Sequence, residues 1–254
     1  MRIHLVSSLY EEDSYTRILH EYLCNFLTTT DIFYHHTPKL LNHDFHSKFK
    51  LASEQMRHLG EILAEQFDKH FILNIGDGNI GLGSVPSFLS FCSKTFPNKK
   101  RKVLWFDKYP RLLSALSSHR CDPDKMTVGF LTKTNEEPFL YPIMNKLNWN
   151  EIIYIGTTKI EPYERLLLEK NNVVIIDDMN QILQTIGENN FIHIHIDWNI
   201  QEDLNFELFE SIQQSNNVIS ADIVNLNQIE TPISWNQLKL LILEMMKYSK
   251  YERK

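Results

Sequence analysis

The sequence predicts an α/β fold of three layers, in which helices cover both faces of a mostly parallel sheet. Short apolar runs alternate with helical segments along the whole chain, as in repeated units of strand, helix and strand. Nearly every position in these runs is apolar, which is typical of strands buried on both faces of a parallel sheet. A chain of 254 residues, 43% of them hydrophobic, is large enough to bury a core on each side of such a sheet.

The predicted strands are seven runs rich in β-branched and aromatic residues. They cover residues 3–6, 71–75, 103–106, 152–155, 173–176, 192–196 and 218–224. Right-handed crossovers are expected to join them into one sheet. Neither a linker nor a repeat nor a low-complexity tract interrupts the chain. Residues 1–254 are therefore predicted to form a single domain.

The helices between these strands are predicted from apolar periodicity. The clearest has five apolar residues at steps of three and four, which would lie on the sheet as one stripe: Ala52, Met56, Leu59, Leu63 and Phe67. A second helix is expected to begin at Ser84, with Pro86 in its first turn. Residues 235–251 carry an amphipathic stripe that is predicted to pack on the sheet. Residues 108–150 contain prolines that break any period.

Charge and cysteine content exclude several classes of protein. The net charge of -6 gives no basic field of the kind that nucleic-acid or membrane-surface proteins carry, and the basic residues 98–102 are interpreted as a solvated loop. Three widely spaced cysteines without a C-x-x-C pair argue against a disulfide scaffold or a zinc cluster. No signal peptide or membrane span is recognisable, so a cytoplasmic protein is predicted, although export without a signal stays open.

Ligands of parallel α/β sheets bind at the carboxyl ends of the strands, so the residues that follow each apolar run are the candidate site residues. These segments are Gly76-Asp77-Gly78-Asn79, Asp107-Lys108-Tyr109-Pro110-Arg111, Gly156-Thr157-Thr158-Lys159, Asp197-Trp198-Asn199 and Asn225-Leu226-Asn227. In order and spacing they resemble the arginase (ureohydrolase) superfamily. That family places Gly-Gly-Asp-His-Ser, Trp-x-Asp-x-His-x-Asp, a Gly-x-Arg-Asp turn, Ser-Phe-Asp-x-Asp and Glu-x-Asn-Pro at its strand ends. The resemblance runs from about Leu51 to the C-terminus and implies a sheet of roughly eight strands.

The resemblance also implies that most of the metal ligands are lost. In the family, six side chains of these motifs bind two manganese ions, and only Asp107 and Asp197 remain of them. The other four ligand positions carry residues of other kinds: Gly78, Tyr109, Arg111 and Asn199. The glutamate that would hold the guanidinium of the substrate is replaced by Asn225.

Chemistry indicates what these losses mean. A two-metal hydrolase needs carboxylates and imidazoles to hold the ions and to lower the pKa of a bridging water. A guanidinium about 4 Å from a divalent ion is repelled by roughly 8 kcal/mol at an effective dielectric constant near 20. Our hypothesis is that an ion pair from Arg111 to Asp107 or Asp197 has replaced the metals. The sequence then predicts a catalytically inactive ureohydrolase-like protein, without a cofactor, that binds a protein partner or a small ligand in the vestigial cleft. Subunit contacts like those of the oligomeric family could serve such a partner or a homo-oligomer.

Two other interpretations of the same residues stay open. His193, His195 and Asp197 alternate along one strand, so His195 and Asp197 could join Asp107 in a site for a single metal; alternatively, the histidines are hydrogen-bonded core residues. The segment 76–81 fits G-x-G-x-x-G after a strand, which would bind NAD or S-adenosylmethionine, unless its glycines only allow a tight turn and close packing.

Two glutamates after the fourth run, Glu161 and Glu164, match acidic positions of the family near the amino acid end of the substrate. They could therefore recognise a small cationic ligand. The alternative that we favour is an exposed first helical turn, where carboxylates suit the positive end of the helix dipole.

Overall fold

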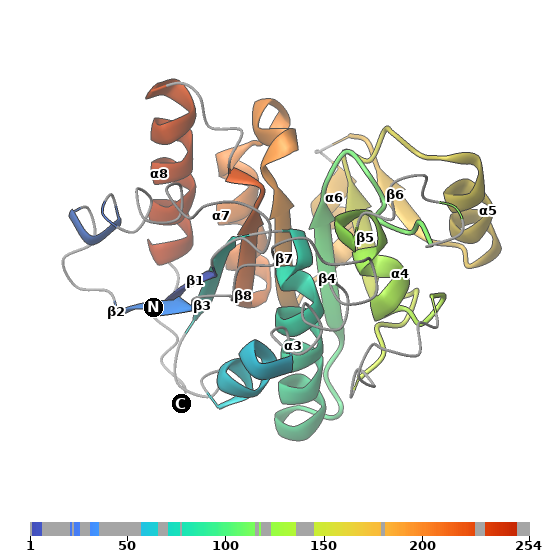
Figure 1. The fold of residues 1–254 in the computed structure, drawn as a ribbon, viewed down its shortest axis with the longest axis horizontal. Coiled ribbons are helices and arrows are strands. Elements are labelled where there is room, and N and C mark those ends of the chain that lie inside the picture. The colour runs from blue at the N-terminus through green and yellow to red at the C-terminus, as the bar shows by residue number, and fades with distance from the viewer. Residues whose placement is uncertain are drawn as a thin grey trace, which may run out of the picture.

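The computed structural model describes residues 2–6, 21, 23–25, 31–35, 57–65, 71–76, 78–114, 117, 123–135, 145–178, 181–226 and 232–247. Eight strands form one sheet in the order β2-β1-β3-β8-β7-β4-β5-β6, and each neighbouring pair is parallel (Figure 1). The strands are β1 (Arg2–Val6), β2 (Asp31–His35), β3 (Ile72–Gly76), β4 (Arg101–Phe106), β5 (Ile152–Ile155), β6 (Val174–Ile176), β7 (Phe191–Asp197) and β8 (Asn217–Val224). The predicted parallel α/β architecture is confirmed.

All seven predicted strands are present, with ends that differ by no more than a residue or two. Strand β2 was not predicted from the sequence. This strand lies at the edge of the sheet and pairs with β1 alone, and both Asp31 and Phe33 are exposed. An edge strand of this kind lacks the unbroken apolar run by which the buried strands were recognised.

Helices cover both faces of the sheet, as predicted. They are α3 (Gly81–Thr95), α4 (Thr127–Leu131), α5 (Pro162–Lys170), α6 (Ile182–Ile186), α7 (Phe206–Ser215) and α8 (Pro232–Lys247). Side chains alternate along β4, so that Trp105 packs with apolar residues of α3, α4 and α5. Leu104 and Phe106 point to the other face and pack with apolar residues of α6, α7 and α8. The sheet therefore separates two apolar cores.

The predicted helical stripes can be tested in part. Residues 57–64 are helical, and Leu59 and Leu63 are buried whereas Glu61 is exposed; Ala52, Met56 and Phe67 lie outside the described residues. In α8, four apolar side chains pack into the core as predicted: Leu238, Leu241, Ile242 and Met245. None of the helices in the described segments is long and apolar enough to cross a membrane.

The prediction that a helix begins at Ser84 is wrong. A 3-10 helix (Gly78–Ile80) leads directly into α3, which begins at Gly81 and contains Pro86 in its interior. The Ser84 hydroxyl does not cap a helix, because it lies one turn inside α3 and donates a hydrogen bond to Asp222 Oδ2 at 2.5 Å. Ser84 with Pro86 two residues later thus resembled a helix start, although the Ser84 hydroxyl is bonded to the Asp222 side chain of β8.

Candidate functional site

The two retained aspartates lie side by side at the carboxyl end of the sheet. Asp107 follows β4, Asp197 is the last residue of β7, and these two strands are neighbours. Both side chains are fully buried or nearly so. Arg111 Nε donates to Asp107 Oδ2 at 2.5 Å, and the second nitrogen of its guanidinium pairs with Asp197 Oδ2. The ion pair expected between Arg111 and these aspartates is therefore present, and it includes both of them.

Amide groups take up the remaining carboxylate oxygens. Asn199 Nδ2 donates to Asp107 Oδ1 at 2.9 Å, and the backbone N–H of Tyr109 donates to the same oxygen at 2.9 Å. Asn225 Nδ2 donates to Asp197 Oδ2 at 2.7 Å, and the Asn199 backbone N–H donates to Asp197 Oδ1 at 3.0 Å. Each of the four carboxylate oxygens thus accepts at least one hydrogen bond from the chain itself.

The single positive charge of Arg111 is shared by two carboxylates, and this affects the pKa of Asp197. Burial and the repulsion of Asp107 raise the pKa of the Asp197 carboxyl, whereas Arg111 and the hydrogen bonds from Asn199 and Asn225 lower it. The net result is a pKa above the usual value for aspartate. Arg111 therefore favours the charged form of Asp197 against the effects of burial and of Asp107.

The backbone of Arg111 is held in a left-handed conformation, with φ at 57°. This conformation is unfavourable for a residue with a side chain and persists where neighbours impose it. The Pro110 carbonyl accepts a hydrogen bond from the buried Tyr154 hydroxyl of β5 at 2.9 Å. The Arg111 carbonyl accepts from the backbone N–H groups of Val128 at 3.0 Å and Gly129 at 3.2 Å, both in α4. The turn that aims the guanidinium at the aspartates is thus fixed from two sides.

A third contact to this turn comes from α5. Glu164 is buried, and its Oε1 accepts a hydrogen bond from the Leu112 N–H at 2.9 Å. Its Oε2 accepts from the Glu161 N–H at 3.0 Å, in a capping box at the start of α5. Burial raises the pKa of Glu164 despite these backbone donors. The helix-start interpretation of both glutamates is supported, but Glu164 is not exposed as expected, because it also anchors the Arg111 turn.

Removing the Tyr154 hydroxyl tests this anchoring. Tyr154→Phe leaves the buried Pro110 carbonyl without its donor and is expected to lower the free energy of unfolding by about 1 to 3 kcal/mol. Tyr163→Phe, at an exposed tyrosine of α5, is the matched control and is expected to change it by less than about 0.5 kcal/mol. Chemical denaturation of the three proteins measures both effects, and equal values for the two variants would contradict the anchoring role.

A cavity of about 470 Å³ lies over the ion pair. It is lined by Lys108, Tyr109, Arg111, Lys125, Lys159, Asn199 and Asn225. Of the predicted site residues, the structure therefore brings Tyr109, Arg111, Asn199 and Asn225 to one cavity, with Asp107 and Asp197 bonded to its lining. Glu161 does not line it, Gly78 lies buried in the 3-10 helix before α3, and Asp77 lies outside the described residues.

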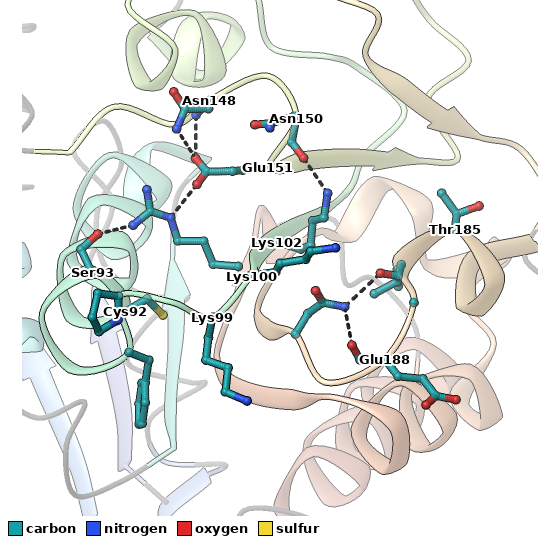
Figure 2. A pocket seen from close by; sticks show the side chains of 16 residues that line it. Cys92, Ser93, Lys99, Lys100, Lys102, Asn148, Asn150, Glu151, Thr185 and Glu188 are labelled. Carbon is teal, nitrogen blue, oxygen red and sulfur yellow. Dashed lines mark hydrogen bonds and ion pairs between the residues drawn. The ribbon is translucent and has the colours of Figure 1, made fainter.

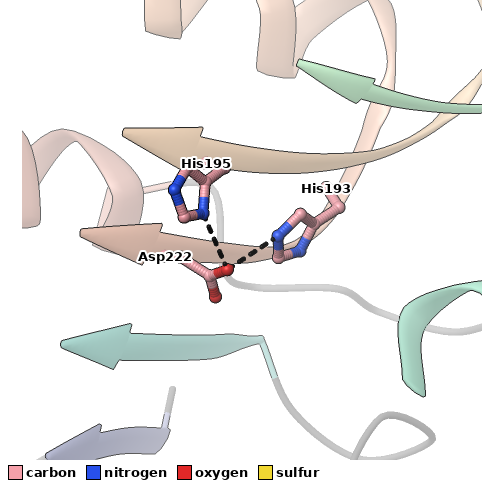
Figure 3. Close-up of side chains that lie close together, drawn as sticks. All are labelled: His193, His195 and Asp222. Carbon is pink, nitrogen blue, oxygen red and sulfur yellow. Dashed lines mark hydrogen bonds and ion pairs between the residues drawn. The ribbon is translucent and has the colours of Figure 1, made fainter. Parts of the chain in front are cut away.

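The two histidines of β7 meet a different partner, Asp222 of β8 (Figure 3). His193 Nε2 and His195 Nδ1 each lie 3.1 Å from Asp222 Oδ2. Ser84 Oγ donates to the same oxygen, and Asn74 Nδ2 donates to Asp222 Oδ1 at 2.7 Å. Within the described segments, His193, His195 and Asp222 have ligand atoms close enough together to hold a metal, yet all three are buried and both histidines are already hydrogen-bonded to Asp222. These contacts favour hydrogen-bonded core histidines over a metal site of His195 with Asp107 and Asp197.

Asp222 is a buried charged residue whose role was not predicted from the sequence. It lies inside an apolar run rather than at a strand end, so the search of the strand ends passed over it. The strand register connects it to the other polar residues, because Asn74, Asp222 and His195 lie in one row across β3, β8 and β7. Burial raises the pKa of Asp222, but the electrostatic attraction of His193 and the hydrogen bonds from both histidines outweigh it and hold the pKa well below its usual range.

The glycine-rich segment packs against the core. Gly78, Asn79 and Ile80 are buried, and Gly81 lies in α3. A Cβ atom at Gly81 would lie only 3.2 Å from the Trp105 ring and 3.3 Å from Thr127. These contacts favour close packing, rather than a backbone open to a pyrophosphate, as the reason for the glycines.

A larger cavity, of about 960 Å³, lies at the other end of the strands, beside the amino ends of β4 and β7 (Figure 2). Basic residues 99–102 contribute to it, but Arg101 and Lys102 are half-buried in β4 rather than part of a solvated loop as expected, and their charges are partly paired. Arg101 forms an ion pair with Glu151 at 2.6 Å, and Lys102 Nζ donates to the Asn150 carbonyl at 2.6 Å. Burial lowers the pKa of Lys102 and raises that of Cys92 to about 12, which favours the protonated thiol.

No protein-family model matches the chain, and no curated protein sequence matches it. Solved structures do. An arginase from Entamoeba histolytica, in complex with L-ornithine, is similar with a TM-score of 0.75 and 17% identity, over 96% of this chain and 98% of that one. An arginase from Bacillus subtilis gives 0.74 and 14%, over 100% of both chains. A T. brucei arginase-like protein, as a quadruple mutant, gives 0.53 and 12%, over 98% of this chain and 89% of that one. The chain has the arginase fold.

Proposed function

We propose that this arginase-fold chain is catalytically inactive as a ureohydrolase and acts by binding a small ligand in the cleft above Arg111. The observation that carries the proposal is the position of the Arg111 guanidinium, which bonds both retained aspartates. In the ureohydrolases the corresponding aspartates are manganese ligands. Here a cation that belongs to the chain itself neutralises them.

Metal binding would have to undo this arrangement. All four carboxylate oxygens of Asp107 and Asp197 accept hydrogen bonds from Arg111, Asn199, Asn225 or the backbone. A divalent ion about 4 Å from the guanidinium would be repelled by roughly 8 kcal/mol at an effective dielectric constant near 20. Without two ions, no bridging water acquires the lowered pKa that attack on a guanidinium carbon requires.

Similarity to the T. brucei arginase-like protein supports the same conclusion. Its four substitutions introduce three aspartates and one histidine in place of serines and an arginine. Aspartate and histidine are metal-ligand residue types, and the present chain lacks such types at four of its own strand-end positions. A cytoplasmic location, a protein partner and a homo-oligomer stay predictions beside the proposed ligand.

Manganese uptake tests the proposal directly. After incubation with manganese and removal of free ions, elemental analysis of the purified chain is expected to find far less than stoichiometric metal. Assays with arginine and agmatine are expected to release no urea. The matched variant restores the ligand types with Gly78→His, Tyr109→His, Arg111→Asp and Asn199→Asp, and is expected to take up manganese. Stoichiometric manganese in the unaltered chain, together with manganese-dependent urea release, would refute the proposal.

A further inference from the structure

The cleft above the ion pair is positively charged. Four of its lining residues are basic, namely Lys108, Arg111, Lys125 and Lys159, and no acidic residue of the described segments lines it. This is unusual for a chain whose net charge is -6. A concave site lined by charges of one sign concentrates its field and attracts ligands of the opposite sign.

The buried aspartates beneath the cleft do not cancel this charge. Asp107 and Asp197 can offset at most half of the four positive charges. Their oxygens are also directed toward Arg111, Asn199 and Asn225, so no carboxylate oxygen is left without a donor to attract a cationic ligand. The cleft therefore presents positive charge to the solvent.

The backbone holds these cations together. The Thr158 and Lys159 N–H groups both donate to the Lys108 carbonyl, at 3.2 and 2.8 Å, which ties the segment after β5 to the segment after β4. Lys159 Nζ donates to the Tyr109 hydroxyl at 3.2 Å. Two cations lie near the Tyr109 ring, with Lys159 Nζ 5.2 Å and the Arg111 guanidinium carbon 5.3 Å from its centroid. A bound anion would relieve the repulsion among these groups, so it would stabilise the cleft as it is built.

We propose that this cleft binds a small oxygen-bearing dianion, either a phosphate monoester or a dicarboxylate. The inference rests on the proposed function, because it requires that no metal occupy the site. A volume of about 470 Å³ accommodates a small metabolite rather than an inorganic ion alone. The ligand preference is thus inverted relative to the cationic guanidinium substrates of the arginases.

Calorimetric titration of the full chain at low ionic strength tests this inference. Inorganic phosphate and succinate are the probes, and agmatine is the cationic control. At least one dianion is expected to bind with a Kd below about 1 mM. Agmatine is expected to show no binding under the same conditions. Tighter binding of phosphate identifies a phosphate monoester as the ligand class, and tighter binding of succinate identifies a dicarboxylate.

Two double variants separate a built site from diffuse charge. Lys108→Gln with Lys159→Gln is expected to weaken dianion binding by about tenfold or more. Lys99→Gln with Lys100→Gln removes an equal number of positive charges at the amino ends of the strands, and it is expected to change dianion binding by less than about twofold. Equal losses in both variants would show diffuse attraction and overturn the inference, as would the absence of dianion binding.

The two proposals fail in distinguishable ways. A chain that binds neither manganese nor a dianion overturns only the anion inference. A chain that takes up manganese and releases urea overturns the proposed function, and the anion inference with it.

Discussion

Replacing Arg111 with methionine is expected to lower the free energy of unfolding by about 3 to 5 kcal/mol at neutral pH. Methionine retains much of the side-chain volume but removes the cation, so two buried carboxylates face each other without compensation. Urea-induced unfolding of the variant and the unaltered chain measures the difference. Arg57→Met is the matched control, because Arg57 forms an exposed ion pair with Glu61, and it is expected to cost less than about 0.5 kcal/mol.

The deficit of the Arg111→Met variant should depend on pH. The pKa of Asp197 is already raised, and loss of the guanidinium raises it further. A carboxyl whose pKa is higher in the folded state than its unfolded value of about 3.9 favours folding below that value and loses this contribution as pH rises through the folded pKa. The deficit should therefore be largest at neutral pH and shrink as pH falls toward about 4. A deficit that is constant over this range would show that packing, and not charge, is the role of Arg111.

Asp222→Asn is expected to lower the free energy of unfolding by a similar amount, about 3 to 5 kcal/mol. The carboxylate accepts hydrogen bonds from Ser84 and Asn74 and contacts two histidine rings, whereas an asparagine amide has no charge and turns an NH₂ group toward one set of donors. Denaturation at neutral pH measures the loss. Asp178→Asn, at an exposed aspartate, is the control and should change stability by less than about 0.5 kcal/mol.

The pH dependence of Asp222 has the opposite sign to that of Asp197. Its folded-state pKa is depressed, so its contribution is present above the unfolded pKa of about 3.9 and is lost as pH falls from there toward the folded pKa. The unaltered chain should therefore lose stability below about pH 4 more steeply than Asp222→Asn. Zinc-dependent stabilisation of the unaltered chain that the variant lacks would indicate a metal site here instead of a hydrogen-bonded core.

The sequence predicted the fold well because burial on both faces leaves a simple signature. Residues 103–106 of β4 and 152–155 of β5 are apolar at every position, so these runs stand out in the sequence. Strand β2 has no such run because it lies at an edge, and Ser84 resembled a cap because its partner, Asp222, is distant in sequence. Local sequence patterns predict strands that are uniformly buried. They fail to predict the role of a residue such as Ser84, whose hydrogen-bond partner is distant in sequence.

The candidate site was predicted in part for the same reason. Asp107, Arg111 and Asp197 follow from the rule that parallel strands present their carboxyl ends together, and the structure joins them. Asn199 and Asn225 were recognised as replaced residues, but their role as hydrogen-bond donors to the aspartates requires side-chain geometry. Lys108 and Lys159 lie in the predicted strand-end segments, but the basic cleft was not predicted, because the sequence does not show that Lys125 joins them around Arg111.

The strand order has a consequence for how the chain matures during synthesis. Strands β7 and β8 lie between β3 and β4, so they separate the strands that leave the ribosome earlier into two groups, β1 to β3 and β4 to β6. Neither group can join the other until residues 191–224 have emerged. Both early groups therefore present open sheet edges until the last two strands have been synthesised.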